Sequence, residues 1–386
     1  MSQELIRIQG LKKYFPVRAG AFSTKSLTLK AVDDVDLTLH KGETLGLVGE
    51  SGCGKTTLGR CMARLYEPDG GRIFLRPDQQ KVEQINAMDA EVAELQQKLD
   101  EMDGNTGFRL RTPPEVRHLK RKIAQKHHEA QTAAADSDIL SMSAHRMKQA
   151  RREIQMVFQD PWASLNPQMV VKDIIGEGPY EFGTHKGADL DKWVMQLLDK
   201  VGLPSIAANR YPHEFSGGQR QRIGIARALA LTPSLIICDE PVSALDVSIQ
   251  AQILNLLISL QDDFDLTYIF IAHDLSVVQY ISDRVAVMYL GKVVETATSQ
   301  QLYGNPRHPY TISLLSAVPV ADPDAKSEEI ILEGDVPSPV NPPSGCSFHP
   351  RCPHRIDVCD KITPLLEKDI NGHRIACHNP PNEPDA

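Results

Sequence analysis

The chain lacks any long uncharged apolar stretch. None of its hydrophobic runs approaches the roughly 18 residues that a membrane-spanning helix needs. The first residues, Met1 to Leu5, lack the basic region and apolar core of a secretory signal peptide. We therefore expect a protein that stays in the cytoplasm, and its 386 residues are enough for two compact units.

An excess of positive charge is also missing. The formal net charge is −8 at pH 7, which disfavours binding to nucleic acid over a broad surface, although a local basic face remains open. A hydrophobic content of 41% is ordinary for a globular protein. Composition alone thus predicts a soluble, folded protein and says nothing about its chemistry.

One string does carry chemistry, and it reads Gly49-Glu50-Ser51-Gly52-Cys53-Gly54-Lys55-Thr56. It has the pattern GxxxxGK(S/T), in which glycines let backbone N–H groups curl around the β- and γ-phosphates of a nucleotide. Lys55 supplies a positive charge, and the hydroxyl of Thr56 is a ligand for Mg²⁺. Because unrelated P-loop enzymes share this pattern, it predicts only nucleotide binding.

A second string can also receive an anion, and it reads Phe215-Ser216-Gly217-Gly218-Gln219. It begins a predicted helix and offers a serine hydroxyl and glycine N–H groups at the helix N-terminus. A nucleotide wrapped by the first string needs no second cradle on the same chain. We therefore predict a dimer in which each chain's second string closes over the nucleotide bound by its partner.

Three further motifs, together with the two strings, resemble the ATP-binding-cassette family in kind and order. Residues 235–240 form an apolar run that ends in two carboxylates, as expected of a buried parallel strand. The resemblance implies that Asp239 holds Mg²⁺ and that Glu240 polarises the attacking water. It also implies that Gln159 senses the metal and the water, and that His273, which alone would be an ordinary histidine at a strand end, lies near the γ-phosphate.

Two further matches complete the resemblance. Residues 243–246 match the loop that crosses the dimer interface. Phe15 matches the aromatic residue that stacks on adenine, and its neighbour Tyr14 is the alternative.

The predicted site residues fall into four sets. The set implied to bind ATP is Phe15, Gly49, Glu50, Ser51, Gly52, Cys53, Gly54, Lys55, Thr56, Thr57, Gln159, Asp239 and His273. The set implied to act in hydrolysis is Glu240, His273 and Gln159, and the set implied to hold Mg²⁺ is Thr56, Gln159 and Asp239. The set implied to contact the partner's nucleotide is Ser216, Gly217, Gly218, Gln219 and Asp246.

The resemblance implies an α/β P-loop fold with a RecA-like core, an antiparallel β subdomain and a helical subdomain, over residues 1–76 and 151–304. Residues 77–150 interrupt the family pattern. Within this insertion, apolar residues follow a heptad seam at Ile85, Met88, Val92, Leu95, Leu99 and Met102, and again at Val116, Leu119 and Ile123.

The insertion is predicted to form an antiparallel helical hairpin that turns at residues 103–107. Residues 81–103 carry seven acids and two bases, whereas residues 109–126 carry seven bases and one acid. Opposite charges on two arms favour their pairing. The hairpin is then either a decoration whose arms stabilise each other or a surface that contacts a partner.

The last segment, residues 305–386, is rich in proline, so we expect an irregular structure there. Four of the chain's seven cysteines lie in it, at Cys346, Cys352, Cys359 and Cys377; the others are Cys53, Cys61 and Cys238. Four thiolates could hold zinc or an iron–sulfur cluster, or remain unliganded, and the close CxxC pairs that zinc sites prefer are missing.

This segment resembles the C-terminal region of ATPase subunits from bacterial oligopeptide and dipeptide importers. That resemblance implies a 4Fe-4S cluster, with zinc as the less favoured alternative. It also implies an ATPase that pairs with a second, non-identical cassette under two membrane permeases, at the cytoplasmic face of the inner membrane.

The implied cargo is a peptide delivered by an extracytoplasmic binding protein, with nickel, glutathione or another small solute as the alternative. Two other classes compete with this function. A cassette that acts on ribosomes or DNA is disfavoured because the chain has one cassette, and a non-catalytic scaffold is disfavoured because Lys55, Asp239, Glu240 and His273 are all present.

Overall fold

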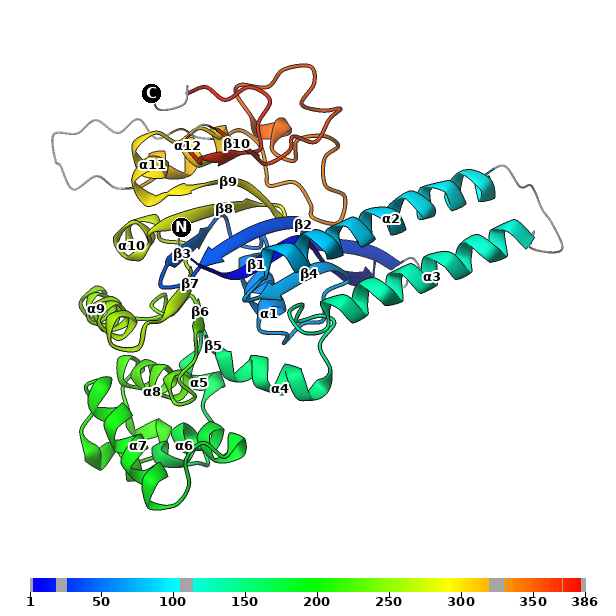
Figure 1. Ribbon diagram of the computed structural model, residues 1–386. Helices are drawn as coiled ribbons and strands as arrows, with labels where there is room; N and C mark the ends of the chain where they lie inside the picture. Colours follow the sequence, from blue (N-terminus) through cyan, green and yellow to red (C-terminus); the bar gives the residue numbers. More distant parts are fainter. Residues whose placement is uncertain are drawn as a thin grey trace.

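The computed structural model describes residues 3–18, 26–104, 114–318, 330, 332–369 and 371–382. Figure 1 shows a mixed sheet near the centre, a helical layer at one end, and two long helices that project from one side. The strands are β1 (Glu4–Arg18), β2 (Ser26–His40), β3 (Thr44–Val48), β4 (Gly70–Leu75), β5 (Ile154–Val157), β6 (Leu235–Asp239), β7 (Thr267–Ile271), β8 (Arg284–Tyr289), β9 (Lys292–Thr298), β10 (Glu367–Lys368) and β11 (Arg374–Ile375).

A helix follows each of the parallel strands β3, β5, β6 and β7, as in other P-loop folds. The helices are α1 (Lys55–Met62), α2 (Gln79–Gly104), α3 (Pro114–Ala134), α4 (Ala144–Glu153), α5 (Pro161–Ser164), α6 (Val171–Phe182), α7 (Ala188–Lys200), α8 (Gly217–Leu229), α9 (Val247–Phe264), α10 (Leu275–Ile281), α11 (Ser299–Gly304) and α12 (Pro309–Ser316). Short 3-10 helices occupy Ser205–Asn209, Pro212–Glu214 and His349–Arg351.

The larger sheet has the strand order β10-β11-β9-β8-β3-β7-β6-β5. Its β5, β6, β7, β3 and β8 are parallel neighbours, while β9, β11 and β10 add antiparallel strands at one edge. Every residue of β3, β6 and β7 is buried. Continuous apolar strands of this kind are covered on both faces, so the residues that follow β3, β6 and β7 emerge together at one edge.

A second sheet is antiparallel and has the order β2-β1-β4. It packs over α1 and the larger sheet through a core that includes Leu11, Val35, Leu58 and Ile271. A separate part of the core joins the larger sheet to α6, α7 and α8, which form the layer at the bottom of Figure 1. The predicted combination of a RecA-like core, an antiparallel subdomain and a helical subdomain is confirmed.

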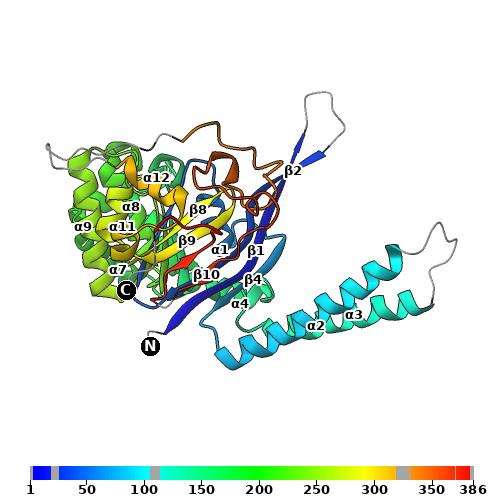
Figure 2. The ribbon, with the colours of Figure 1, turned by 90° about the horizontal axis from the view of Figure 1, so that it is seen from above.

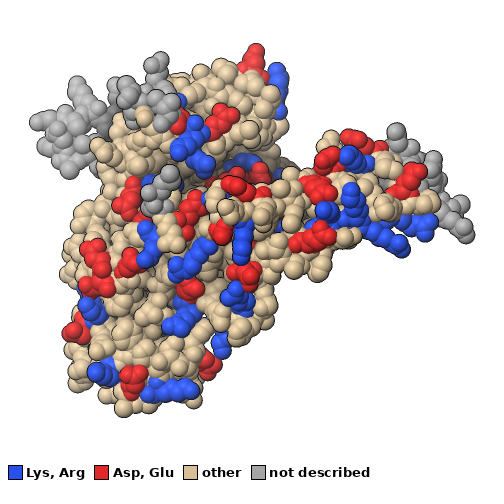
Figure 3. Space-filling view, in the orientation of Figure 1, with Lys and Arg blue, Asp and Glu red and all other residues tan. Residues whose placement is uncertain are grey.

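The predicted helical hairpin is also present. Figures 1 and 2 agree that α2 and α3 run side by side and project away from the two sheets. The seam residues Ile85, Leu95, Leu99 and Val116 are buried between the arms, as the heptad pattern predicts. Figure 3 shows acidic side chains along the upper arm and basic side chains along the lower arm. The predicted turn lies mostly in residues 105–113, outside the described residues.

The expectation that the two arms stabilise only each other is wrong at their base. There Val82, Ile85 and Ala134 pack on Phe74 of β4 and form a small apolar cluster. A bridge between Phe74 and Asp138 ties the chain after α3 to the same strand. The base of the hairpin is therefore part of the folded body.

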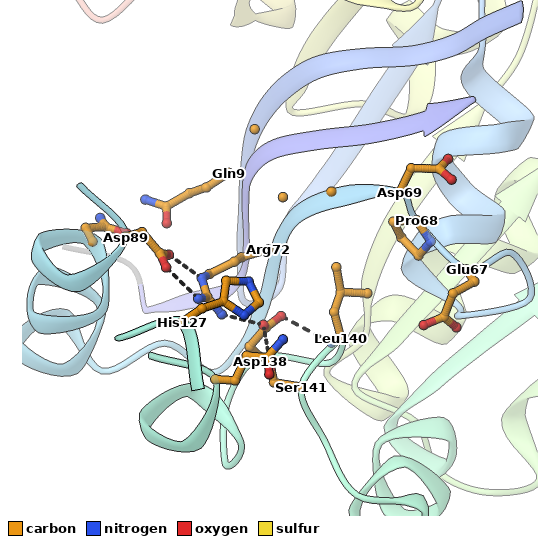
Figure 4. A pocket seen from close by; sticks show the side chains of 15 residues that line it. Gln9, Glu67, Pro68, Asp69, Arg72, Asp89, His127, Asp138, Leu140 and Ser141 are labelled. Atoms are coloured by element: carbon orange, nitrogen blue, oxygen red, sulfur yellow. Dashed lines mark hydrogen bonds and ion pairs between the residues drawn. The ribbon is translucent and has the colours of Figure 1, made fainter. Parts of the chain in front are cut away.

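An ion-pair network reinforces this base, and it lies in a cavity of about 700 Å³ (Figure 4). Arg72 reaches from β4 to Asp89 on α2 at 2.5 Å and to Asp138 at 3.0 Å. Asp138 is buried and also accepts a hydrogen bond from the hydroxyl of Ser141 at 2.7 Å. The carboxylate of Asp138 is thus fully hydrogen-bonded within the protein. We therefore interpret the groups around this cavity as structural contacts between the hairpin and β4.

The C-terminal segment is irregular, as predicted, but it does not stand apart from the sheet. Residues 374 and 375 of β11 pair with β9, so the segment continues the edge of the larger sheet. The backbone of Lys30 on β2 donates a hydrogen bond to the carbonyl of Pro339 at 3.1 Å. The proposed boundaries at residues 76, 150 and 304 stay predictions.

Within the described part of the chain, none of the helices combines the length and the apolar character needed to cross a lipid bilayer.

Shortening the hairpin should be tolerated, whereas removing its base should not. The arms lie close together at Glu91 and Lys126, whose charged groups are 3.1 Å apart. We expect deletion of residues 93–125, with a short Gly/Ser linker, to change the free energy of unfolding by less than about 1 kcal/mol. The buried Leu95, Leu99 and Val116 pack on the opposite arm and are removed together with it, so their burial is offset by the ordering entropy of the deleted residues, and a change in loop length costs little. Urea denaturation of the purified chain measures the change.

Deletion of residues 82–134 is the matched comparison. It removes Val82, Ile85 and Asp89, so Phe74 loses its apolar neighbours and Arg72 keeps only Asp138. We expect a loss of about 3 kcal/mol or more, because each buried aliphatic side chain contributes about 1.5–3 kcal/mol. Equal losses in the two deletions would contradict this interpretation.

Candidate active site

The glycine-rich string forms a tight loop between β3 and α1. Gly49 has φ +146° and Gly54 has φ +110°. A Cβ on Gly49 would lie 2.2 Å from the carbonyl oxygen of Met288, and one on Gly54 would lie 2.1 Å from that of Ala31. Only glycine fits at these two positions, because backbone strain and close backbone contact act together.

Lys55 turns back into this loop. Its ammonium group donates hydrogen bonds to the carbonyl oxygens of Gly49 at 2.7 Å and Glu50 at 3.1 Å, and the residue is only 5% exposed. A buried positive charge inside a ring of backbone groups attracts phosphate.

Asp239 ends β6 directly opposite the first turn of α1. The hydroxyl of Thr56 donates a hydrogen bond to its Oδ1 at 2.7 Å. Its Oδ2 is buried and has no hydrogen-bond partner among the described residues, and Arg60 Nη2 lies 3.9 Å away. Burial raises the pKa of the Asp239 carboxyl group.

These two side chains fit a hard divalent cation. A carboxylate and a hydroxyl are oxygen ligands of the kind that Mg²⁺ accepts, and it retains several waters. The carboxylate oxygen without a hydrogen bond is free to serve as a ligand.

Glu240, the next residue, contacts the side chains of two other predicted site residues, Gln159 and His273. Its Oε2 accepts a hydrogen bond from Gln159 Nε2 at 2.8 Å and lies 3.3 Å from His273 Nδ1. Glu240 itself has φ 47°, a left-handed conformation that is uncommon outside glycine. Residues that follow β5, β6 and β7 thus converge on one carboxylate.

Lys55, Thr56, Gln159, Glu240 and His273 open into one cavity of about 420 Å³, whereas the predicted site residues Gly49, Glu50, Cys53 and Asp239 do not line it. It is lined by Phe15, Leu29, Ala31, Ser51, Gly52, Gly54, Lys55, Thr56, Thr57, Gln159, Glu240 and His273. Phe15 reaches the cavity, whereas the hydroxyl of Tyr14 donates a hydrogen bond to Asp33 at 2.5 Å. The structure therefore favours Phe15 over Tyr14 as the aromatic residue at this site.

The second string, Phe215 to Gln219, lies outside this cavity. Ser216 caps α8, and its hydroxyl and the side chain of Gln219 exchange hydrogen bonds with each other's backbone N–H groups at 3.3 and 3.0 Å. A Cβ on Gly217 would touch Leu245, and one on Gly218 would lie 2.6 Å from Ile249, so the string borders the segment around Asp246. None of these residues lines the cavity beside Lys55.

Comparisons with known proteins agree with this geometry. The ABC transporter family model matches residues 32–143 and 123–243, and the model of the oligopeptide/dipeptide transporter C-terminal region matches residues 294–359. The chain is 46% identical over 382 residues to the oligopeptide transport ATP-binding protein AppF of Bacillus subtilis, and the alignment covers 97% of each chain. It is 43% identical to a probable peptide ABC transporter ATP-binding protein of Sinorhizobium fredii, over 98% of this chain and 90% of that one.

The chain belongs to the ABC transporter family of ATPases. Among solved structures, it resembles the dimeric ATP-binding cassette MJ0796 in a post-hydrolysis state with ADP and phosphate, with a TM-score of 0.54 at 20% identity. That alignment covers 76% of this chain and 99% of the other. At this identity, the likeness supports the fold alone.

The predicted iron–sulfur ligands are less well supported than the nucleotide site. The C-terminal family region reaches Cys346, Cys352 and Cys359 but ends before Cys377. Among the described residues, no three His, Cys, Asp or Glu side chains are arranged so that they could hold a metal ion. The four thiols do not form a closed ligand set, and the cluster stays a prediction.

The cysteines nevertheless lie near one another. The backbone N–H of Cys346 donates a hydrogen bond to the carbonyl of Cys359 at 2.7 Å. Burial, together with the negative charges of the Cys346, Cys352 and Cys359 thiolates, raises the pKa of Cys377 to about 12.

Three residues around the site belong to none of the sequence motifs that predict it. Arg60 approaches Asp239, the hydroxyl of Tyr310 accepts a hydrogen bond from the Glu50 N–H at 2.8 Å, and Arg351 pairs with the Glu50 carboxylate. A lone arginine or tyrosine far along the chain carries no local signal of such a contact.

Replacing Asp239 by asparagine should stabilise the nucleotide-free protein. Because burial raises its pKa, the charged carboxylate opposes folding above the pKa of an unfolded aspartate, about 3.9. We expect Asp239→Asn to raise the free energy of unfolding by about 1 kcal/mol at pH 7. The gain should shrink as the pH falls towards 4, since the wild-type carboxyl group then takes up a proton.

Thermal denaturation between pH 4 and pH 8 measures this difference. Asp246→Asn is the matched control, because Asp246 is exposed and its side chain makes no capping hydrogen bond. A gain at Asp239 that does not depend on pH would contradict the assigned cause.

Proposed function

We propose that this chain hydrolyses ATP to drive the import of peptides by a binding-protein-dependent transporter. The observation that carries the proposal is the convergence of Gln159, Glu240 and His273 on the cavity that also holds Lys55 and Thr56. The peptide cargo is supported by the names of the two curated relatives, which refer to oligopeptide and peptide transport. Nickel, glutathione or another small solute is the alternative cargo.

The side chains have distinct roles in this proposal. Lys55 and the N–H groups of the glycine-rich loop bind the phosphates, and Phe15 stacks on the adenine. Thr56, Asp239 and Gln159 hold Mg²⁺, which when bound neutralises charge on the β- and γ-phosphate oxygens.

Glu240 orients the water that attacks the γ-phosphate, and Gln159 and His273 fix the carboxylate from two sides. Little covalent chemistry falls to the protein, since phosphoryl transfer is catalysed mainly by positioning and charge stabilisation.

The complete site would need two chains. Ser216, Gly217, Gly218, Gln219 and Asp246 lie outside the cavity of their own chain, so we assign them to the nucleotide of a partner cassette.

The remaining partners follow from transport. We propose a second, non-identical cassette, two permease subunits and an extracytoplasmic binding protein, with this chain peripheral to the cytoplasmic face of the membrane.

Glu240→Gln should abolish turnover and spare ATP binding. The amide keeps the shape of the carboxylate but cannot polarise the attacking water, so we expect the rate to fall by about 10²–10⁴. Phosphate release by the assembled transporter and ATP titration of the isolated chain measure the two effects. A mutant assembly that keeps more than about a tenth of the wild-type rate would refute the role of Glu240.

Ser216→Arg is the control for the two-chain site. It should leave ATP binding by its own chain unchanged and lower hydrolysis only in the assembly. A loss of ATP affinity in the isolated chain would show that Ser216 serves its own nucleotide.

We further propose that Cys346, Cys352, Cys359 and Cys377 hold a 4Fe-4S cluster rather than zinc. This proposal is supported by the presence of four thiol groups in one segment. They lie close enough that the charges of Cys346, Cys352 and Cys359 affect the pKa of Cys377. Binding would require these loops to close around the cluster.

Protein purified without oxygen should then be brown, absorb near about 400 nm and contain about four irons per chain. Cys352→Ser should lower the iron content before it lowers ATP affinity. Stoichiometric zinc without iron would overturn the cluster.

A further inference from the structure

A long-range ion pair connects the C-terminal segment to the phosphate loop. Arg351 Nη1 lies 3.1 Å from both carboxylate oxygens of Glu50, the second residue of the glycine-rich string. The Arg351 side chain is only 9% exposed. Its guanidinium group is thus largely withdrawn from water, and it faces the hydroxyl of Tyr289 as well as this carboxylate.

The same segment also holds the main chain of Glu50. The hydroxyl of Tyr310 accepts the Glu50 N–H at 2.8 Å. Tyr310 packs against Phe348 and Tyr289 with ring centroids 5.4 and 4.7 Å apart. Phe348 precedes the short 3-10 helix that ends at Arg351, so one aromatic cluster supports both contacts.

The inner side of the loop is held by Lys55, which bonds the carbonyls of Gly49 and Glu50. The peptide groups on both sides of Glu50 are therefore fixed, one through its N–H and the other through its carbonyl. The position of Glu50 decides where the first N–H groups of the loop point.

Charge gives Arg351 a second effect. Glu50 places a negative charge in a loop that has to receive the negative charge of phosphates. Pairing with Arg351 neutralises that charge at short range, where screening by water is weak because the guanidinium group is buried. Without the arginine, the carboxylate would repel the ligand.

We propose that Arg351 is a positioning residue of the nucleotide site, which orients Glu50 and neutralises it so that the loop can accept ATP. This inference rests on the proposed function in one respect, that the cavity beside Lys55 binds ATP. On this inference, the C-terminal segment contributes to ATP binding through Arg351.

The test is ATP titration of the full chain by calorimetry, at low and high salt. We expect Arg351→Ala to weaken ATP binding about tenfold, as the loss of a hydrogen-bonded charge partner predicts, and Arg351→Lys to restore most of the affinity. The double variant Arg351→Ala with Glu50→Gln should bind ATP more tightly than Arg351→Ala alone, because it lacks the unpaired charge.

Arg355→Ala is the matched control. Arg355 lies in the same segment, is half exposed, and pairs with Asp360 at 3.3 Å, away from the loop. It should bind ATP as the wild type does. Thermal denaturation of each variant shows whether it is folded.

The outcomes separate this inference from the proposed function. Wild-type affinity in Arg351→Ala overturns the inference and leaves the proposed function standing. A weakened variant that Glu50→Gln does not rescue overturns the charge effect, because a merely structural role would not respond to that change. Failure of the wild-type chain to bind ATP would instead overturn the proposed function.

Discussion

The parallel pairing of β6, β7 and β3 fixes the distances on which the nucleotide site depends. Asp239 lies opposite Ile271 in the register of β6 and β7, and Leu47 lies opposite the same residue in β3. The backbone N–H of Glu240 then donates to the carbonyl of Ile271 at 3.0 Å. Because all three strands are buried, they cannot slide without exposing apolar side chains or breaking hydrogen bonds. The loop, the two carboxylates and His273 are therefore held by the same ladder.

This arrangement carries a stability cost at one residue. Asp239 is 1% exposed, and one of its oxygens lacks a hydrogen bond among the described residues. A buried carboxylate of this kind is unfavourable for the empty protein. It is suited to a site that gains a cation with its nucleotide, since a ligand that binds only the folded state stabilises it.

Much of the site could be predicted because its residues belong to short motifs next to apolar strands. The strands that lead to Gly49 and to Asp239 can be recognised in the sequence by their runs of apolar residues. Each motif then follows within a few residues. The hairpin of α2 and α3 could also be predicted from the sequence, since its heptad seam is a local pattern. In contrast, the packing of Val82 and Ile85 on Phe74 depends on a contact between separate elements, and the heptad pattern gave no sign of it.

The contact between Glu50 and Arg351 was out of reach for the same reason. Neither residue is unusual in its own surroundings, and 301 positions separate them. The cysteines show the opposite situation. Their clustering along the chain predicts a metal site, and that site stays a prediction, because spacing in an irregular segment sets no geometry.

The position of β3 has a consequence for how the protein is made. This early strand lies between β7 and β8, which are encoded more than half a chain later, and the loop that follows it is bonded to Tyr310 and Arg351. A ribosome therefore releases the glycine-rich string long before its neighbours exist. During that interval the apolar strand β3 has no partner strands, and it must be kept from pairing with other chains, because unpaired apolar strands are prone to aggregate. Completion of the nucleotide pocket is thus one of the last events in the synthesis of this chain.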